Sequence, residues 1–309
     1  MLFGWVPFSI GDLLIASILI YFIRSLLILI KTKFANFKNS ILKFLGIVSI
    51  LYSCFYWFWG LNYFRVPLAK SMGFEKKSYS TELLFDVTTK IIRNLNNIHV
   101  SINSNDSTAI SNPYSQKEMY RMAVSGFDKL ANNYPQFTYK IPSIKSSMMS
   151  LLQTYNSTAG YLNPLTGEAQ VNDMIPKAGY PTTICHEMAH QIGIAAENEA
   201  NFVGYLAALH HKDSYFKYAA YRMAFSYLIG ELRNHNRDLY SKAIAMVNKG
   251  ILEDFKNSNS FWSKYKNPIE PYIKKGYNSY LKANKQSKGI QSYNYVVDLI
   301  ISYEELEIQ

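Results

Sequence analysis

The chain opens with two apolar runs that have the length of membrane-spanning helices. Residues 13–30 read LLIASILIYFIRSLLILI, with Arg24 as the only charge, and residues 44–63 form an uncharged run with the aromatic stretch YWFW at 56–59. About 20 apolar residues cross the hydrocarbon core of a bilayer, and aromatic side chains favour its interface with water. The pattern predicts two spanning helices in an anchor over 1–63. The alternative is a buried hairpin in a soluble protein.

The pattern changes after the second run. Residues 64–80 are expected to form a polar juxtamembrane linker, and residues 81–309 a single domain. Helical spacing of apolar residues follows Ser80, and Ser115 with Glu118 has the spacing of a capping box. Residues 144–172 are strand-like and rich in turn signals, whereas everything after Pro181 has a helical pattern. The order predicts an α+β domain, mostly helical, with a small antiparallel sheet.

The lysines near the apolar runs predict an orientation. Four of them, Lys31, Lys33, Lys38 and Lys43, lie around the connection between the runs, and no Lys or Arg precedes the first. Basic residues favour the cytoplasmic side, so the domain is expected outside the cytoplasm. Basic residues also follow the second run, at 65, 70, 76 and 77, and weaken the asymmetry. A further N-terminal span would invert the orientation.

Composition narrows the function classes. The net charge is +10, but the lysines are dispersed and no nucleic-acid-binding motif accompanies them, so we expect contact with anionic lipid and not with nucleic acid. The low charged fraction, 17% against 49% hydrophobic, also fits a lipid-facing segment. The two cysteines, Cys54 and Cys185, exclude a disulfide framework and have no metal-binding spacing.

Candidate chemistry is concentrated in the sequence HEMAH at 186–190. On a helix, His186 and His190 lie one above the other on one face, so both imidazoles can reach a single Zn²⁺ ion. Glu187 is displaced about 100° around the helix, beside the ion instead of on it. That position suits a general base acting on zinc-activated water. The alternative is an exposed helix face with no metal.

Zinc requires a third protein ligand, and two glutamates follow the motif helix. Gly193 allows the chain to reverse before Glu197 and Glu199, which point about 200° apart on the next helix. We expect Glu197 to be the ligand, because its neighbour Asn201 can hydrogen-bond to a ligand histidine. Glu199 is the alternative if Glu197 still belongs to the turn.

Other residues are less specific candidates. The stretches 160–164 and 167–172 could form a β-hairpin whose edge binds an extended peptide, although an ordinary structural hairpin is equally compatible. Candidates for stabilising a tetrahedral intermediate are several His, Tyr and Arg side chains, namely His210, His211, His235, Tyr161, Tyr218, Tyr221 and Arg222. Four C-terminal tyrosines are expected in the core or an interface, namely Tyr272, Tyr280, Tyr293 and Tyr295.

These motifs resemble two families. HExxH followed by the ExxxN pattern of Glu197 and Asn201 resembles the gluzincin metallopeptidases, which implies a zincin-like domain. More closely, the chain resembles the bacterial membrane proteins catalogued as domain of unknown function 3810. That resemblance is carried by GWVPFSIGD at 4–12, by residues 186–205, and by YLKAN at 280–284 with Ser292 and Tyr293. It implies a bacterial inner-membrane location and a zinc peptidase fold without an established substrate.

The sequence therefore predicts a membrane-bound zinc metallopeptidase that hydrolyses peptide bonds of a peptide or protein substrate. Zn²⁺ would be held by His186, His190 and Glu197, and Glu187 would act as general base. A competing hypothesis is a non-catalytic membrane protein with a structural metal site, serving as a sensor or assembly factor. Hydrolysis of another amide or an ester would use the same metal chemistry.

Overall fold

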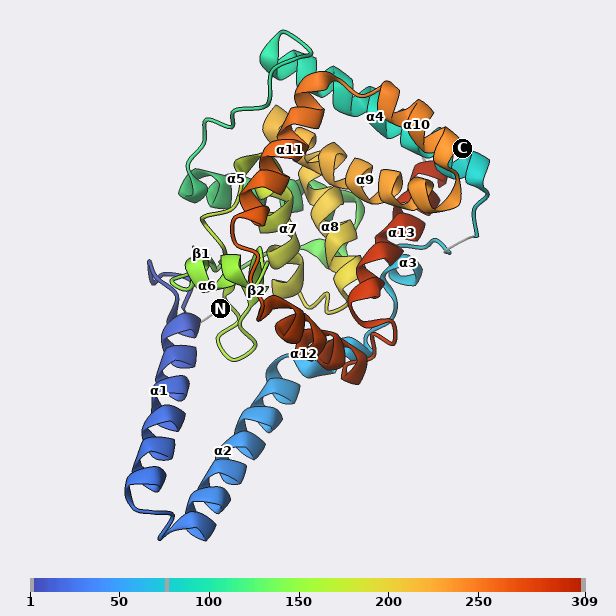
Figure 1. Cartoon of the computed structure of the whole chain (residues 1–309). Helices are drawn as coiled ribbons and strands as arrows, with labels where there is room; N and C mark the ends of the chain where they lie inside the picture. The colour runs from blue at the N-terminus through green and yellow to red at the C-terminus, as the bar shows by residue number, and fades with distance from the viewer. Residues whose placement is uncertain (1–2, 76–77, 307–309) are drawn as a thin grey trace.

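Two long helices project from one side of a mostly helical domain in the computed structural model, which describes residues 3–75 and 78–306 (Figure 1). Helices α1 (Ile10–Lys31) and α2 (Phe37–Phe58) each have 22 residues, and no residue of their apolar windows is buried. At about 1.5 Å per residue each helix is about 33 Å long, enough to cross a bilayer. The expected pair of apolar N-terminal helices is confirmed.

The second helix differs from its expected range of 44–63. It begins seven residues earlier, at Phe37, and ends at Phe58, after which a 3₁₀ helix, η1 (Gly60–Phe64), turns along the domain. Trp59 is buried there, packed edge-on against the ring of His190 with 5.8 Å between centroids. Apolar composition alone could not separate the exposed residues of α2 from Trp59, which packs against the domain.

The segment expected as a polar linker contributes to the domain. It contains a short helix, α3 (Leu68–Ser71), and Leu68, Ala69 and Phe74 are buried in the hydrophobic core. The backbone N–H of Leu68 donates to Oε1 of Glu199 at 2.8 Å. This part of the chain is therefore fastened to the helices that carry the HExxH motif.

The domain core lies between helices that are distant in sequence. Helices α4, α5, α7, α8, α9 and α13 supply most of the buried apolar side chains. Helix α4 begins after Ser80 as expected, with the Ser80 side chain as its cap, and the expected capping box of Ser115 and Glu118 is present at α5. The helices of the domain are α4 (Thr81–Asn103), α5 (Gln116–Asn133), α6 (Ser150–Tyr155), α7 (Tyr180–Gln191), α8 (Glu197–His210), α9 (Ser214–His235), α10 (Arg237–Ala245), α11 (Lys249–Ser263), α12 (Glu270–Ala283) and α13 (Val296–Leu306), with 3₁₀ turns η2 (Pro135–Phe137), η3 (Lys177–Gly179) and η4 (Gly289–Tyr295).

A three-stranded sheet lies beside α7. Strands β2 (Gly160–Leu162) and β3 (Ala169–Val171) form the expected antiparallel hairpin, but β1 (Ile144–Ser146) pairs with β3 in parallel. The sheet is therefore mixed, which corrects the expectation of an antiparallel sheet. The reason is that β2, which follows α6, runs opposite to β1, and the hairpin turn then returns β3 between the two in the direction of β1.

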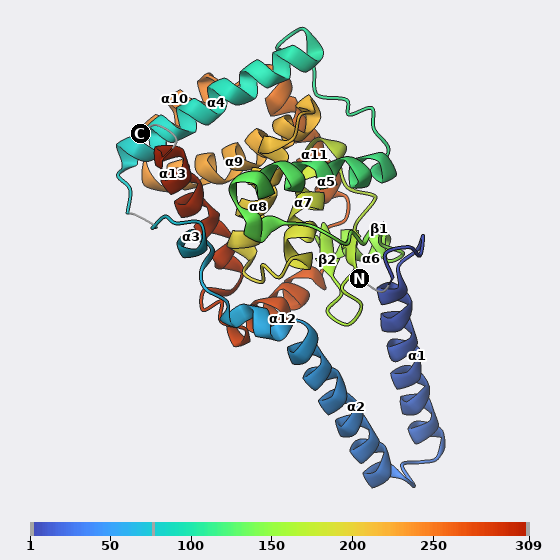
Figure 2. The same ribbon diagram turned by 180° about the vertical axis from the view of Figure 1, so that it is seen from behind.

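Buried polar groups hold the start of α1 against this sheet. The carboxylate of Glu168 accepts the N–H of Gly11 at 2.5 Å and of Ile10 at 3.2 Å, and it forms a buried ion pair with Lys145. A negative charge at a helix N-terminus is favourable, because the free N–H groups and the helix dipole point toward it. Asp12 in turn accepts the N–H of Met148 at 2.7 Å. The start of the first apolar helix is thus fixed to the domain, and Figure 2 shows from behind that it lies beside β1.

Replacing Glu168 with Gln should destabilise the protein strongly. Lys145 would remain buried without its counter-charge, which costs about 3–5 kcal/mol. Glu253→Gln is the matched control, because Glu253 pairs with Lys256 on the exposed surface of α11 and exposed pairs contribute little. Thermal unfolding in detergent, followed by circular dichroism, should show a large fall of the midpoint for Glu168→Gln alone. Equal midpoints for the two variants would contradict the anchoring role of Glu168.

Candidate metal centre

Two consecutive helices carry the predicted metal ligands. Helix α7 presents His186, Glu187 and His190, and it ends at Gln191. Gly193 follows with φ at 89°, a left-handed conformation that glycine adopts without strain and that reverses the chain after a helix. Helix α8 then begins at Glu197 itself, so this carboxylate lies in the first helical turn and not in the preceding loop.

The structure brings His186, His190 and Glu197 together. Oε2 of Glu197 lies 3.4 Å from Nε2 of His186 and 3.5 Å from Nε2 of His190, and all three ligand atoms lie within 4.8 Å of one another. Tetrahedral zinc ligands at about 2.1 Å from the ion stand about 3.4 Å apart. The three side chains therefore have both the composition and the spacing of a zinc site. No other such group of His, Cys, Asp or Glu occurs within residues 3–75 and 78–306.

The charges of the cluster are strongly coupled. Burial alone would raise the pKa of Glu197, but the adjacent His190 and His186 hold it well below its usual range. Burial lowers the pKa of His190, and the opposing charge and hydrogen bond of Glu197 overcome this and raise it to about 9. A carboxylate that stays ionised beside two imidazoles is a donor set that a divalent cation can use.

Neighbouring groups orient the candidate ligands. Nδ1 of His190 hydrogen-bonds to the carbonyl oxygen of Ile194 at 2.7 Å, which leaves Nε2 facing the cluster. The hydroxyl of Tyr277, from α12, donates to Oε1 of Glu197 at 2.9 Å. The prediction that Asn201 supports a histidine is wrong, because its side chain donates to the hydroxyl of Tyr227 at 3.0 Å. Helical spacing placed Asn201 near Glu197 but could not reveal Tyr227, which comes from α9.

Glu187 lies beside the cluster and outside it. Its side chain is buried, and Oε2 has no hydrogen-bond partner among the described residues. Burial raises its pKa, although His186 and His190 partly oppose this effect. A Cβ atom on Gly160 would lie 2.6 Å from Oε1 of Glu187, so only glycine lets strand β2 approach the carboxylate this closely. The arrangement suits a proton acceptor next to a bound substrate.

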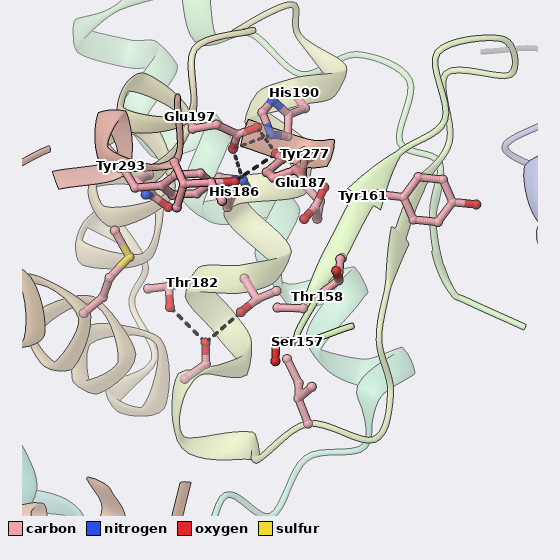
Figure 3. Close-up of a pocket in the computed structure, with 18 of the residues that line it drawn as sticks. Ser157, Thr158, Tyr161, Thr182, His186, Glu187, His190, Glu197, Tyr277 and Tyr293 are labelled. Atoms are coloured by element: carbon pink, nitrogen blue, oxygen red, sulfur yellow. Dashed lines mark hydrogen bonds and ion pairs between the residues drawn. The ribbon is translucent and has the colours of Figure 1, made fainter. Parts of the chain in front are cut away.

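The cluster opens into a pocket of about 800 Å³. Figure 3 shows His186, His190, Glu197 and Tyr277 gathered at one end, with Glu187 facing strand β2. The rest of the wall combines hydroxyl groups, aromatic rings and cationic side chains, including Thr158, Thr182, Tyr293, Trp262, Arg222 and Lys274. This volume can hold several residues of a peptide.

Comparison with protein-family models gives a match over residues 1–301 to the family described as Protein of unknown function (DUF3810). The chain belongs to this family. No curated protein and no solved structure matches it. The DUF3810 description names no activity, so the chemistry of the site rests on the residues themselves.

Most of the residues suggested for transition-state stabilisation are occupied elsewhere in this DUF3810 chain. His210 and His211 hydrogen-bond to backbone carbonyls, His235 lies near Glu231, and Tyr218 donates to Asp254. Tyr161 lines the pocket but points away from the cluster and donates to Asp12 (Figure 3). Tyr221 is not among the residues that line the pocket, whereas Arg222 is and donates to Ser258 at 2.9 Å.

Tyrosines from the C-terminal part of the chain, and not the residues suggested above, lie near the cluster of His186, His190 and Glu197. Tyr280 and Tyr293 line the pocket, which corrects their expected role as core or interface residues. Tyr277 was not predicted from the sequence. Its hydroxyl oxygen lies 3.1 Å from the hydroxyl oxygen of Tyr293. Burial and the charge of Glu197 raise the pKa of Tyr277, so it keeps its proton and donates. Tyr280 and Tyr293 fall in the DUF3810-like stretches, and that resemblance was the available signal. Tyr272 and Tyr295 remain exposed.

Side-by-side zinc titrations of Glu197→Ala and Glu199→Ala should separate the two glutamates. Glu197 faces both imidazoles, whereas Glu199 accepts the N–H of Leu68. Loss of a partner that only supports a ligand weakens metal binding about 10- to 100-fold, so loss of Glu197 should exceed that. Glu199→Ala should leave zinc affinity nearly unchanged. The opposite ranking would overturn the assignment.

Proposed function

We propose that this protein is a membrane-anchored zinc metallopeptidase. The observation that best supports this proposal is a pair of distances: Oε2 of Glu197 lies 3.4 Å from Nε2 of His186 and 3.5 Å from Nε2 of His190. Both distances match the separation between ligand atoms of tetrahedral zinc. The motif helix, the second helix with its glutamate and the adjacent edge strand together support a zincin-like arrangement. Zinc would be held by His186, His190 and Glu197.

The donor set favours a catalytic site over a structural one. Structural zinc is closed by four protein ligands, whereas catalytic zinc has three and keeps one position for substrate or water. Three candidate ligands meet here among the described residues, and the pocket lies on their open side. A purely structural site would also have no use for a buried carboxylate at position 187.

The residues have distinct roles in this proposal. When bound, zinc supplies a Lewis acid that polarises the scissile carbonyl and lowers the pKa of water. Glu187 accepts the proton from water and returns it to the leaving amine, which its raised pKa favours. Tyr277 holds Glu197 through a hydrogen bond. Tyr293, whose hydroxyl oxygen lies 3.1 Å from that of Tyr277, is a candidate donor to the negative charge that develops on the substrate.

A polypeptide substrate fits the sheet edge. Strand β2 is an edge strand in the order β1-β3-β2, and residues 156–162 line the pocket. An extended peptide can add to such an edge through main-chain hydrogen bonds, which require little of its sequence. Gly160 would bring that peptide next to Glu187. These features support peptide hydrolysis over hydrolysis of a smaller amide or ester.

The two apolar helices support a membrane anchor for this enzyme. We infer the bacterial inner membrane as its location, with the turn between α1 and α2 in the cytoplasm because lysines surround it, and the metal centre outside.

Glu187→Gln should keep zinc and lose turnover, because an amide cannot accept a proton from water. The expected fall in cleavage of a mixed peptide library is at least about 100-fold. Glu253→Gln on the exposed face of α11 should match the unmodified protein, and His190→Ala should lose both zinc and activity. Metal analysis of each purified full chain accompanies the assay. Release of zinc by Glu187→Gln would make Glu187 a ligand and refute the mechanism.

The orientation is testable in intact cells. A cysteine at Lys38, in a Cys54→Ser chain, should resist an impermeant thiol reagent, because the lysine-rich turn is expected in the cytoplasm. A cysteine at Lys242, exposed on the domain, should react when the outer membrane is permeabilised. The reverse labelling pattern would invert the orientation without affecting the metal site.

A further inference from the structure

The domain exposes apolar side chains around the points where the two apolar helices leave it. They precede α1, follow α2, and lie on α6 and at the start of α12. Their exposed fractions are high, for example 84% for Trp5, 62% for Leu152 and 76% for Tyr272. We call this set the collar; it comprises Trp5, Phe8, Leu61, Phe64, Val66, Met148, Leu151, Leu152, Tyr155, Ile269 and Tyr272. Exposed apolar residues that gather on one face mark an interaction surface.

Hydrogen bonds place the part of the collar on α6 next to the start of α1. Asp12, in the first turn of α1, accepts hydrogen bonds from Oγ of Ser147 at 2.9 Å and from the N–H of Met148 at 2.7 Å. Helix α6 starts two residues after Met148. Its exposed leucines, Leu151 and Leu152, therefore lie close to the level at which α1 leaves the domain.

Helix α12 connects this region with the root of α2. Near its start, Ser157 donates to Glu270 at 2.7 Å, and Asn267 donates to the carbonyl of Tyr155 at 2.7 Å. Toward its end, the ring of Tyr280 lies 6.1 Å from that of Phe55, near the end of α2. Both whole-chain views show α6 and α12 on the side from which α1 and α2 project (Figures 1 and 2).

The composition of α12 fits a bilayer surface. Leu281 is the only residue of this helix that is buried, whereas Tyr272 and the preceding Ile269 are exposed. Exposed lysines lie on the same helix and on the segment after it, namely Lys275, Lys282, Lys285 and Lys288. Helices with aromatic and aliphatic residues beside lysines lie in the interface of anionic membranes. A protein partner would need no such continuity with two membrane-spanning helices.

We propose that the collar lies in the interface of the bilayer, with the lysines of α12 meeting anionic lipid headgroups. The metal pocket then opens at the membrane surface. Two contacts place the pocket close to that surface: Trp59, the residue after α2, packs on His190, and Tyr277 of α12 reaches Glu197. This inference rests on the proposed function and adds a substrate class to it: the substrates are polypeptide segments held at the membrane surface, not chains free in bulk water.

Nitroxide accessibility in nanodiscs tests the collar without using activity or zinc. Full-length Cys54→Ser protein, in which Cys185 is fully buried, receives a single cysteine at Leu152, Tyr272 or, as control, Lys242 on α10. The discs contain phosphatidylglycerol and phosphatidylcholine. Oxygen concentrates in lipid, whereas a neutral nickel complex stays in water. The ratio of the oxygen collision rate to the nickel collision rate with the nitroxide should therefore be several-fold higher at positions 152 and 272 than at position 242.

Three outcomes would overturn the proposal. Equal ratios at all three positions would place the collar in water. A fall of both collision rates at 152 and 272 would show coverage by a partner protein or a second copy. A further experiment adds Lys275→Glu and Lys282→Glu to the protein labelled at position 272. Its collision-rate ratio should then fall in the discs that contain phosphatidylglycerol and stay unchanged in discs of pure phosphatidylcholine. An unchanged ratio in the discs that contain phosphatidylglycerol would refute the headgroup contact, and Lys242→Glu is its charge control.

Discussion

The carboxylate of Glu197 between two imidazoles is the interaction on which the rest of the site depends. Buried charges are stable only when they are paired, and Glu197 faces His186 and His190 at 3.4 and 3.5 Å. The pairing requires α7 and α8 to reverse sharply at Gly193 and to pack closely, while Ile194 and Tyr277 fix the orientation of the ligands. In our proposal a bound cation supplies the positive charge that compensates this carboxylate.

The same constraint connects the site to the apolar helices. Trp59 ends α2 against His190, and Arg65 donates to the carbonyl oxygen of Ile192 at 2.9 Å, next to the Gly193 turn. On the other side, Glu168 and Asp12 hold the start of α1 against the sheet whose edge approaches Glu187. The two apolar helices are therefore joined to the framework of the candidate metal centre.

Local patterns predicted what depends on neighbours in sequence. The spacing of His186 and His190, the turn at Gly193, the capping box of α5 and the β2–β3 hairpin all follow from residues a few positions apart. Three features could not be predicted: the parallel pairing of β1, the partner of Asn201, and the place of Tyr277. Each depends on contacts between distant segments, and with 25 tyrosines in the chain, composition could not single out one.

The most direct test of the account is zinc X-ray absorption on the purified full chain, compared with His186→Ala. The account predicts one zinc per chain, with nitrogen and oxygen neighbours at about 2.0–2.2 Å and two imidazoles among them, and loss of this signal in the variant. Absence of stoichiometric zinc would contradict it. So would a sulfur neighbour at about 2.3 Å, or a zinc signal that survives the removal of His186.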